Sequence, residues 1–113
     1  MTVRIEVTQR DIDRAKAMQE KAFQAEEENS RISSFDSPCQ CPIALATKRK
    51  VRKPVAVFGA DHMEIAGYKE YRATKASEKK ATKLIDNFDA RNYDKCRPII
   101  IEIEPEPVMD WYD

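Results

Sequence analysis

The sequence predicts a small α+β domain, in which two or three helices pack on one face of a mainly antiparallel sheet of four or five strands. Apolar and charged residues alternate in segments 3–7 and 99–104, which is the two-residue period of a half-buried strand. In segment 81–88 the apolar residues instead follow the spacing of one helix face. A chain of 113 residues fits one such domain with one hydrophobic core.

The first half of the chain contains one predicted strand and two predicted helices. The strand at 3–7 leads to Thr8, a good N-cap for a helix, and Asp11 follows three positions later as in a weaker variant of the capping box. A second, short helix begins at Cys41 and Pro42, because proline fits the first helical position, where no backbone N–H is needed. The first helix has the apolar stripe Ile12, Ala15, Met18, Ala22 and Phe23, and the second presents Ile43, Ala46 and either Ala44 or Leu45 to the core.

The second half of the chain predicts a hairpin, a helix and a final strand. The hairpin turns at Gly59, Ala60 and Asp61, where Gly59 can take a positive φ angle, and Gly67 marks a second turn into a short strand at 68–72. In the final strand, alternate isoleucines face the core, and Ile100, Glu102 and Glu104 point away from it, toward solvent or a partner. Prolines 105 and 107 end this strand, so we expect one domain over 1–104 and an acidic, aromatic tail over 105–113.

The composition predicts a cytosolic protein. The apolar runs are far shorter than a membrane-spanning helix requires, and the N-terminal segment lacks the apolar stretch of a signal peptide. The chain has three cysteines, an odd number, which fits reduced thiols better than a disulfide framework.

Several residues could carry chemistry, but their pattern does not favour an enzyme. Cys39, Cys41, Cys96 and His62 are the residue types of a zinc site, yet Cys39 and Cys41 are separated by one residue rather than the usual two to four. Cys41 is more simply a small buried residue at a helix start, and His62 a residue in or beside a hairpin. With only two glycines, the chain has no glycine-rich phosphate loop. We therefore predict no metal, no cofactor and no catalytic residue.

The charge distribution is uneven although the net charge is zero. Residues 48–83 carry eleven Lys and Arg against four Asp and Glu, whereas residues 84–113 carry three against eight. The run KRKVRK and the lysine face of the last helix could contact phosphates, or they could be ordinary solvated surface. The basic candidates for partner binding are Lys48, Arg49, Lys50, Arg52 and Lys53 in the run, with Lys75, Lys79 and Lys83 on the helix. In the tail, Trp111 and Tyr112 either fold back onto the domain or meet a partner.

Taken together, the segments VTQRDIDRAK, CPIALAT, MEIAG, LIDNFDA and IIIEIE resemble a loose group of small, uncharacterised bacteriophage proteins. These proteins share a helix of the CPIALAL type and a hairpin whose second strand ends in glycine. The resemblance covers most of the chain outside the loop at 26–38 and the tail. It departs after residue 90, where Arg91 and Asn92 replace a glycine, and Asn92 could supply the left-handed helix stop instead.

The resemblance implies a phage or prophage origin and a small accessory protein that acts in the bacterial cytoplasm. We expect a non-enzymatic binding protein whose partner is a host or defence component, either a protein or a small signalling molecule held between subunits. The alternative is a nucleic-acid-binding protein that uses segment 48–53 and the lysine face of the last helix.

Overall fold

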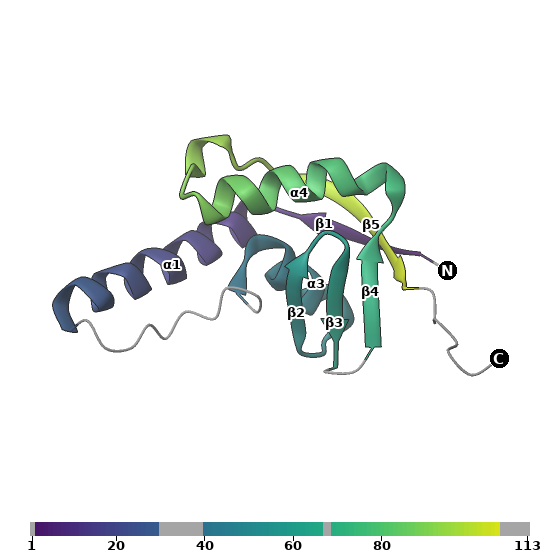
Figure 1. Ribbon diagram of the computed structural model, residues 1–113, viewed down its shortest axis with the longest axis horizontal. Coiled ribbons are helices and arrows are strands. Elements are labelled where there is room, and N and C mark those ends of the chain that lie inside the picture. Colours follow the sequence, from purple (N-terminus) through teal and green to yellow (C-terminus); the bar gives the residue numbers. More distant parts are fainter. Residues whose placement is uncertain (1, 30–39, 67–68, 107–113) are drawn as a thin grey trace.

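The computed structural model describes residues 2–29, 40–66 and 69–106 (Figure 1). The predicted α+β class is confirmed, as is the order of the elements along the chain. The structure contains β1 (Val3–Val7), α1 (Gln9–Asn29), α3 (Pro42–Val51), β2 (Val55–Gly59), β3 (His62–Ile65), β4 (Lys69–Ala73), α4 (Lys75–Asp89), a 3₁₀ turn (Tyr93–Lys95) and β5 (Ile99–Pro105).

The five strands form one antiparallel sheet in the order β1-β5-β4-β3-β2. The first and last strands of the chain, β1 and β5, therefore lie side by side, while β2, β3 and β4 form a meander on the other side of β5 (Figure 1). The two edge strands, β1 and β2, both contact α3. A single helix can touch both edges only if the sheet curls around it, so α3 fills the concave side of the sheet.

Two helices, α3 and α4, cover one face of the sheet, which carries the hydrophobic core, while α1 packs on α3 and extends away from the strands (Figure 1). α3 contacts β1 and β2, and α4 contacts β4 and β5. On β5 the predicted alternation is confirmed, because Ile101 is 0% exposed whereas its neighbour Ile100 is 40% exposed. The predicted stripe of the last helix is also confirmed: Ala81, Leu84 and Phe88 are buried, and Ile85 is half-buried.

Asp11 joins the start of α1 to β1 and α3. Its carboxylate accepts hydrogen bonds from the backbone N–H and the hydroxyl of Thr8, at 2.9 and 3.0 Å, while the Thr8 hydroxyl accepts from the Asp11 N–H. This is the capping box that the sequence predicts. The Arg49 guanidinium of α3 donates to the same carboxylate at 2.9 Å and to the Glu6 carbonyl of β1 at 3.0 Å. Arg49, by binding both Asp11 and the Glu6 carbonyl, thus links α1, α3 and β1, and Asp11 is only 3% exposed.

The protonation of Asp11 reflects this set of partners. Burial by itself raises the pKa of the carboxyl group, but hydrogen bonds from Arg49 and Thr8 outweigh it and hold the pKa below its ordinary value of 3.8. The charged form is therefore the one that the fold stabilises.

The start of α3 agrees with the sequence. Cys41 is the N-cap residue and Pro42 the first helical residue, and the Cys41 thiol accepts a hydrogen bond from the Ala44 N–H at 3.4 Å. Ala44, rather than Leu45, is the third core residue of this helix. The interior position predicted for Cys41 is confirmed.

Two local predictions about the backbone were wrong. Gly59 does not adopt a positive φ angle; the strand instead has an irregular register between Val57 and Gly59. After α4, Arg91 takes the left-handed conformation (φ 62°), whereas Asn92 has φ −86°. The Arg91 and Asn92 N–H groups both return to carbonyls of the last helical turn, so the reversal falls one residue earlier than the side-chain preference of asparagine suggests.

Other predicted features lie outside the described residues. These are the turn at Gly67, the segment 30–39 with Cys39, and the tail from residue 107 with Trp111 and Tyr112. The first two residues expected in the tail are described: β5 includes Pro105, and the Glu106 N–H donates to the Glu70 carbonyl at 3.0 Å.

The alternation on β5 predicts that alanine substitutions of two adjacent isoleucines lower the free energy of unfolding by different amounts. Ile101→Ala should lower the free energy of unfolding by about 2–5 kcal/mol, because it leaves a cavity in the core. Ile100→Ala, one residue away on the exposed side, should cost about 1 kcal/mol or less. Urea unfolding of both variants measures the difference, and equal losses would contradict the one-sided core.

Asp11→Asn should destabilise the protein at pH 7 by about 1–3 kcal/mol, since Arg49 and Thr8 lose a charged acceptor. The pKa of Asp11 is lower in the folded state than in the unfolded chain, so the carboxylate stabilises the fold fully at pH values above 3.8. That contribution fades as the pH falls through the folded-state pKa. The difference in the free energy of unfolding between wild type and variant should therefore become smaller in acid, as measured by urea unfolding at several pH values.

The matched control for Asp11→Asn is Asp13→Asn, whose exposed carboxylate accepts a hydrogen bond from Gln9 in the same helix. This control should change the free energy of unfolding by about 0.5 kcal/mol or less. If the difference in the free energy of unfolding between wild type and Asp11→Asn stays constant from pH 7 into acid, the charge of Asp11 is not what the fold stabilises.

Candidate functional site

The side of the sheet that faces away from the helices, here called the outer face, is strongly acidic. Its side chains alternate with the buried residues of each strand, and none of them is itself buried. Six glutamates face this side, against two arginines and one histidine. The outer face comprises Arg4, Glu6, Ala56, Phe58, His62, Glu64, Glu70, Arg72, Ile100, Glu102, Glu104 and Glu106.

Three of these glutamates form a continuous line across the sheet, which we call the acidic row. Glu64 of β3 lies directly opposite Glu70 of β4 in the strand register. Glu106, just after β5, donates its N–H to the Glu70 carbonyl and so lies on the other side of Glu70. Neighbouring strands are about 4.8 Å apart, and like charges directly opposite each other destabilise a sheet. The acidic row is therefore an electrostatic cost that the fold itself does not require.

His62 contacts two members of the acidic row. Its Nδ1 atom lies 3.1 Å from a Glu106 oxygen and its Nε2 atom 3.8 Å from a Glu64 oxygen. The hydrogen bond to Glu106 raises the pKa of His62 above its ordinary value of 6.5, and the negative charges of Glu106, Glu70 and Glu64 add to that shift. This shift favours the protonated imidazole, whose single positive charge can offset only part of the charge of three carboxylates.

An exposed aromatic ring lies beside this histidine. Phe58 is 58% exposed, and its ring stacks on His62 with a centroid distance of 5.6 Å. Phe58 is the most exposed large hydrophobic residue in the part of the chain that the structure describes. An apolar contact surface therefore adjoins the acidic row.

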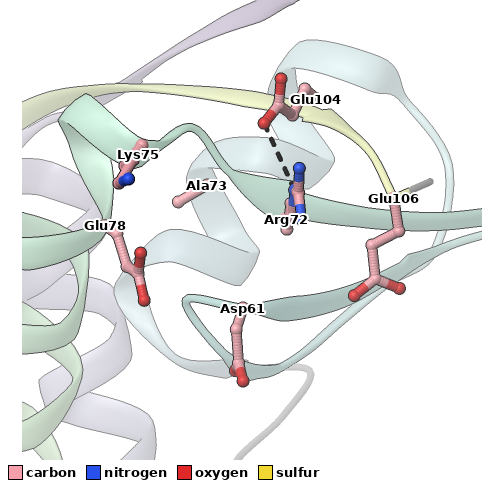
Figure 2. Close-up of a pocket in the computed structure, with 7 residues that line it drawn as sticks. All are labelled: Asp61, Arg72, Ala73, Lys75, Glu78, Glu104 and Glu106. Carbon is pink, nitrogen blue, oxygen red and sulfur yellow. Dashed lines mark hydrogen bonds and ion pairs between the residues drawn. The ribbon is translucent and has the colours of Figure 1, made fainter.

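A cavity of about 270 Å³ opens where the outer face meets the first turn of α4 (Figure 2). Arg72 points toward Glu104 across it, and their side chains form an ion pair at 3.3 Å. Since four carboxylates and two basic groups surround the cavity, it suits a cationic group better than an anion. Its lining residues are Asp61, Arg72, Ala73, Lys75, Glu78, Glu104 and Glu106.

The two described cysteines lie away from this surface and are protonated at neutral pH. Burial raises the pKa of the Cys41 thiol to about 11, and it also raises the pKa of Cys96. A nucleophilic or metal-binding cysteine has to be a thiolate, which these environments disfavour. Within residues 2–29, 40–66 and 69–106, no three His, Cys, Asp or Glu side chains are grouped so that they could hold a metal ion.

The structure separates the two basic segments predicted for partner binding. Segment 48–53 ends α3 and precedes the first residue of β2, whereas Lys75 follows the last residue of β4. β2 and β4 run parallel, as both are antiparallel to β3, so Lys53 and Lys75 lie at opposite ends of these strands. Lys75 also lines the acidic cavity. The exposed residues of the two segments are Lys48, Lys50, Arg52 and Lys53 in the first, and Lys75, Lys79 and Lys83 in the second.

Arg49 is engaged within the fold rather than offered to a partner, because its guanidinium binds Asp11 and the Glu6 carbonyl. The sequence offered no sign of this contact, since Asp11 lies 38 residues before Arg49. The acidic row was also missed. Alternation on β5 predicted that Glu102 and Glu104 face outward, but only the strand order brings Glu64, Glu70 and Glu106 together.

No protein-family model, curated protein or solved structure shows detectable similarity to this chain. The resemblance to bacteriophage proteins therefore stays a prediction. Among the described residues, every helix is too short or too polar to cross a membrane.

The contact between His62 and Glu106 predicts a shift that can be measured. In Glu106→Gln the pKa of His62 should fall toward 6.5, because the imidazolium loses its charged acceptor. NMR titration of the His62 ring protons reads this directly, since the chain has a single histidine. The control Glu104→Gln removes a carboxylate that is paired with Arg72 instead, so it should shift the pKa less. Equal shifts in both variants would argue for a general field effect.

Proposed function

We propose that this chain is a non-enzymatic binding protein whose outer face docks a basic segment of a partner protein. The acidic row carries this proposal. Glu64, Glu70 and Glu106 lie side by side, and His62 lies within ion-pair distance of two of them, Glu64 and Glu106. A fold needs no such row for stability, and lysine or arginine placed across it would relieve the repulsion between the carboxylates.

The chemistry of the neighbouring residues fits a protein partner. The stacked pair of Phe58 and His62 offers an aromatic surface next to the row, and binding interfaces commonly combine an aromatic contact with charged groups around it. Complementary charge would speed the association and select basic partners over acidic ones. The cavity beside Glu104 and Glu106 gives a second place for a cationic side chain.

Nucleic-acid binding is less well supported by this arrangement. Phosphates are repelled by the acidic outer face, and Arg49 is already bound to Asp11. The two basic segments begin at opposite ends of the strands, so they do not extend one another into a single stripe. The resemblance to bacteriophage proteins adds an expected source for the partner, namely a protein of the bacterial host or of its defence.

Neutralising two members of the acidic row should weaken partner binding. We expect the double variant Glu64→Gln, Glu70→Gln to weaken capture of a bacterial partner by about 10- to 100-fold, which is the usual cost of losing charged hydrogen bonds. The matched control, Lys79→Gln with Lys83→Gln on α4, should capture the same protein as the wild type. Both experiments use the full chain as bait in bacterial lysate, with captured proteins quantified by mass spectrometry.

Salt provides a second readout, because an association driven by exposed charges weakens as the Debye length shortens. Capture that survives in the glutamate variant would contradict the proposal. Capture of nucleic acid that is lost in the lysine variant would support the alternative function instead.

A further inference from the structure

We propose that a second copy of this chain supplies the basic segment that docks on the outer face, and that the two copies do so reciprocally. The docking residues are Lys50, Arg52 and Lys53 of one copy against the acidic row of the other. This inference rests on the proposed function of the outer face and names the occupant of that face.

The basic segment 48–53 is presented in a fixed conformation. α3 ends at Val51, and Arg52 adopts a left-handed conformation with φ 57°, its N–H bound to the Lys48 carbonyl at 2.7 Å. Because this cap fixes the backbone, less conformational entropy is lost when the segment binds than for a flexible chain.

The segment also has charges to offer. Within the described residues, no ion pair involves Lys48, Lys50, Arg52 or Lys53, and all four are exposed. Arg49 is the exception, since Asp11 binds it. One surface of the chain therefore has four basic side chains to offer, and the other has an excess of carboxylates. The net charge of the whole chain is zero. The two surfaces are complementary in sign.

The basic segment and the acidic row are neighbours at the same end of the sheet. The Pro54 carbonyl, directly after the segment, accepts a hydrogen bond from the Ala66 N–H at 2.8 Å. Two residues along each strand, Ala56 lies opposite Glu64, the first member of the row. The acidic row thus begins about three residues, or roughly 10 Å of strand, from the end of the basic segment.

This adjacency points to a closed dimer. When complementary patches lie side by side, a two-fold axis between them places each patch over its complement on the other copy, so both contacts form at once. Two-fold dimers are the most common soluble oligomers, and the closed arrangement leaves no unpaired patch for further growth. A contact made by only one patch of each copy would instead continue into chains.

Analytical ultracentrifugation of the full chain at about 0.05 M and about 0.5 M salt tests the dimer. We expect the mass of two chains at low salt and of one chain at high salt. Lys50→Glu with Lys53→Glu should be monomeric at low salt, as should Glu64→Lys with Glu70→Lys. A dimer of the wild type that is unaffected by salt and by both charge reversals would overturn the inference.

Mixing the two reversed variants gives the decisive result. In a 1:1 mixture each interface contact regains opposite charges, so a heterodimer should form although neither variant dimerises alone. Thermal melting confirms that each variant is folded, and Lys79→Glu with Lys83→Glu on α4 should dimerise like the wild type. A mixture that stays monomeric would overturn the inference.

The failure of this inference can be told from failure of the proposed function. A labelled peptide with the sequence of residues 47–54 serves as the probe. If the wild type is monomeric but binds the peptide, and Glu64→Gln with Glu70→Gln does not, the second copy is ruled out and the outer face remains a docking surface for basic segments. If the wild type neither dimerises nor binds the peptide, both proposals lose their support.

Discussion

Every strand of this sheet gives alternate side chains to a core that lies on one side only, and the rest of the structure depends on that constraint. β5 shows it most clearly, because it lies between β1 and β4 and its Ile101 and Ile103 are fully buried. A shift of the register by one residue would bring Glu102 into the core, where an unpaired carboxylate is prohibitively costly. The hydrophobic core therefore fixes the register of the whole sheet, including the side that it does not touch.

The acidic row follows from that fixed register. Glu64, Glu70 and Glu106 cannot separate without disturbing the pairing of β3, β4 and β5, so the sheet holds their charges together despite the repulsion. The carboxylate of Asp11 is in the opposite situation. It is buried, but it accepts hydrogen bonds from Thr8 and Arg49. The fold thus pairs the buried acid Asp11 with a base, whereas the carboxylates of the outer face stay exposed or half-buried and outnumber the bases beside them.

The sequence predicted the features that depend on neighbours along the chain. The alternation at 99–104, the stripe of α4, the capping box at Thr8 and the interior position of Cys41 each follow from local periodicity or a helix start, and the structure confirms them. Contacts between distant segments were out of reach, because periodicity does not give strand order. For that reason Arg49 was counted among the partner-binding candidates although it binds Asp11, and the line formed by Glu64, Glu70 and Glu106 was not foreseen.

The alternation along β5 has a consequence for how such a protein can change over generations. Ile101 and Ile103 maintain the fold, whereas Glu102 and Glu104, which separate and follow them, contribute little to the core. Substitutions on the outward positions can therefore accumulate with small effects on folding while they change the charge and shape of the surface. A binding protein with this division of labour could follow a changing target through single exchanges, without first having to find a new fold.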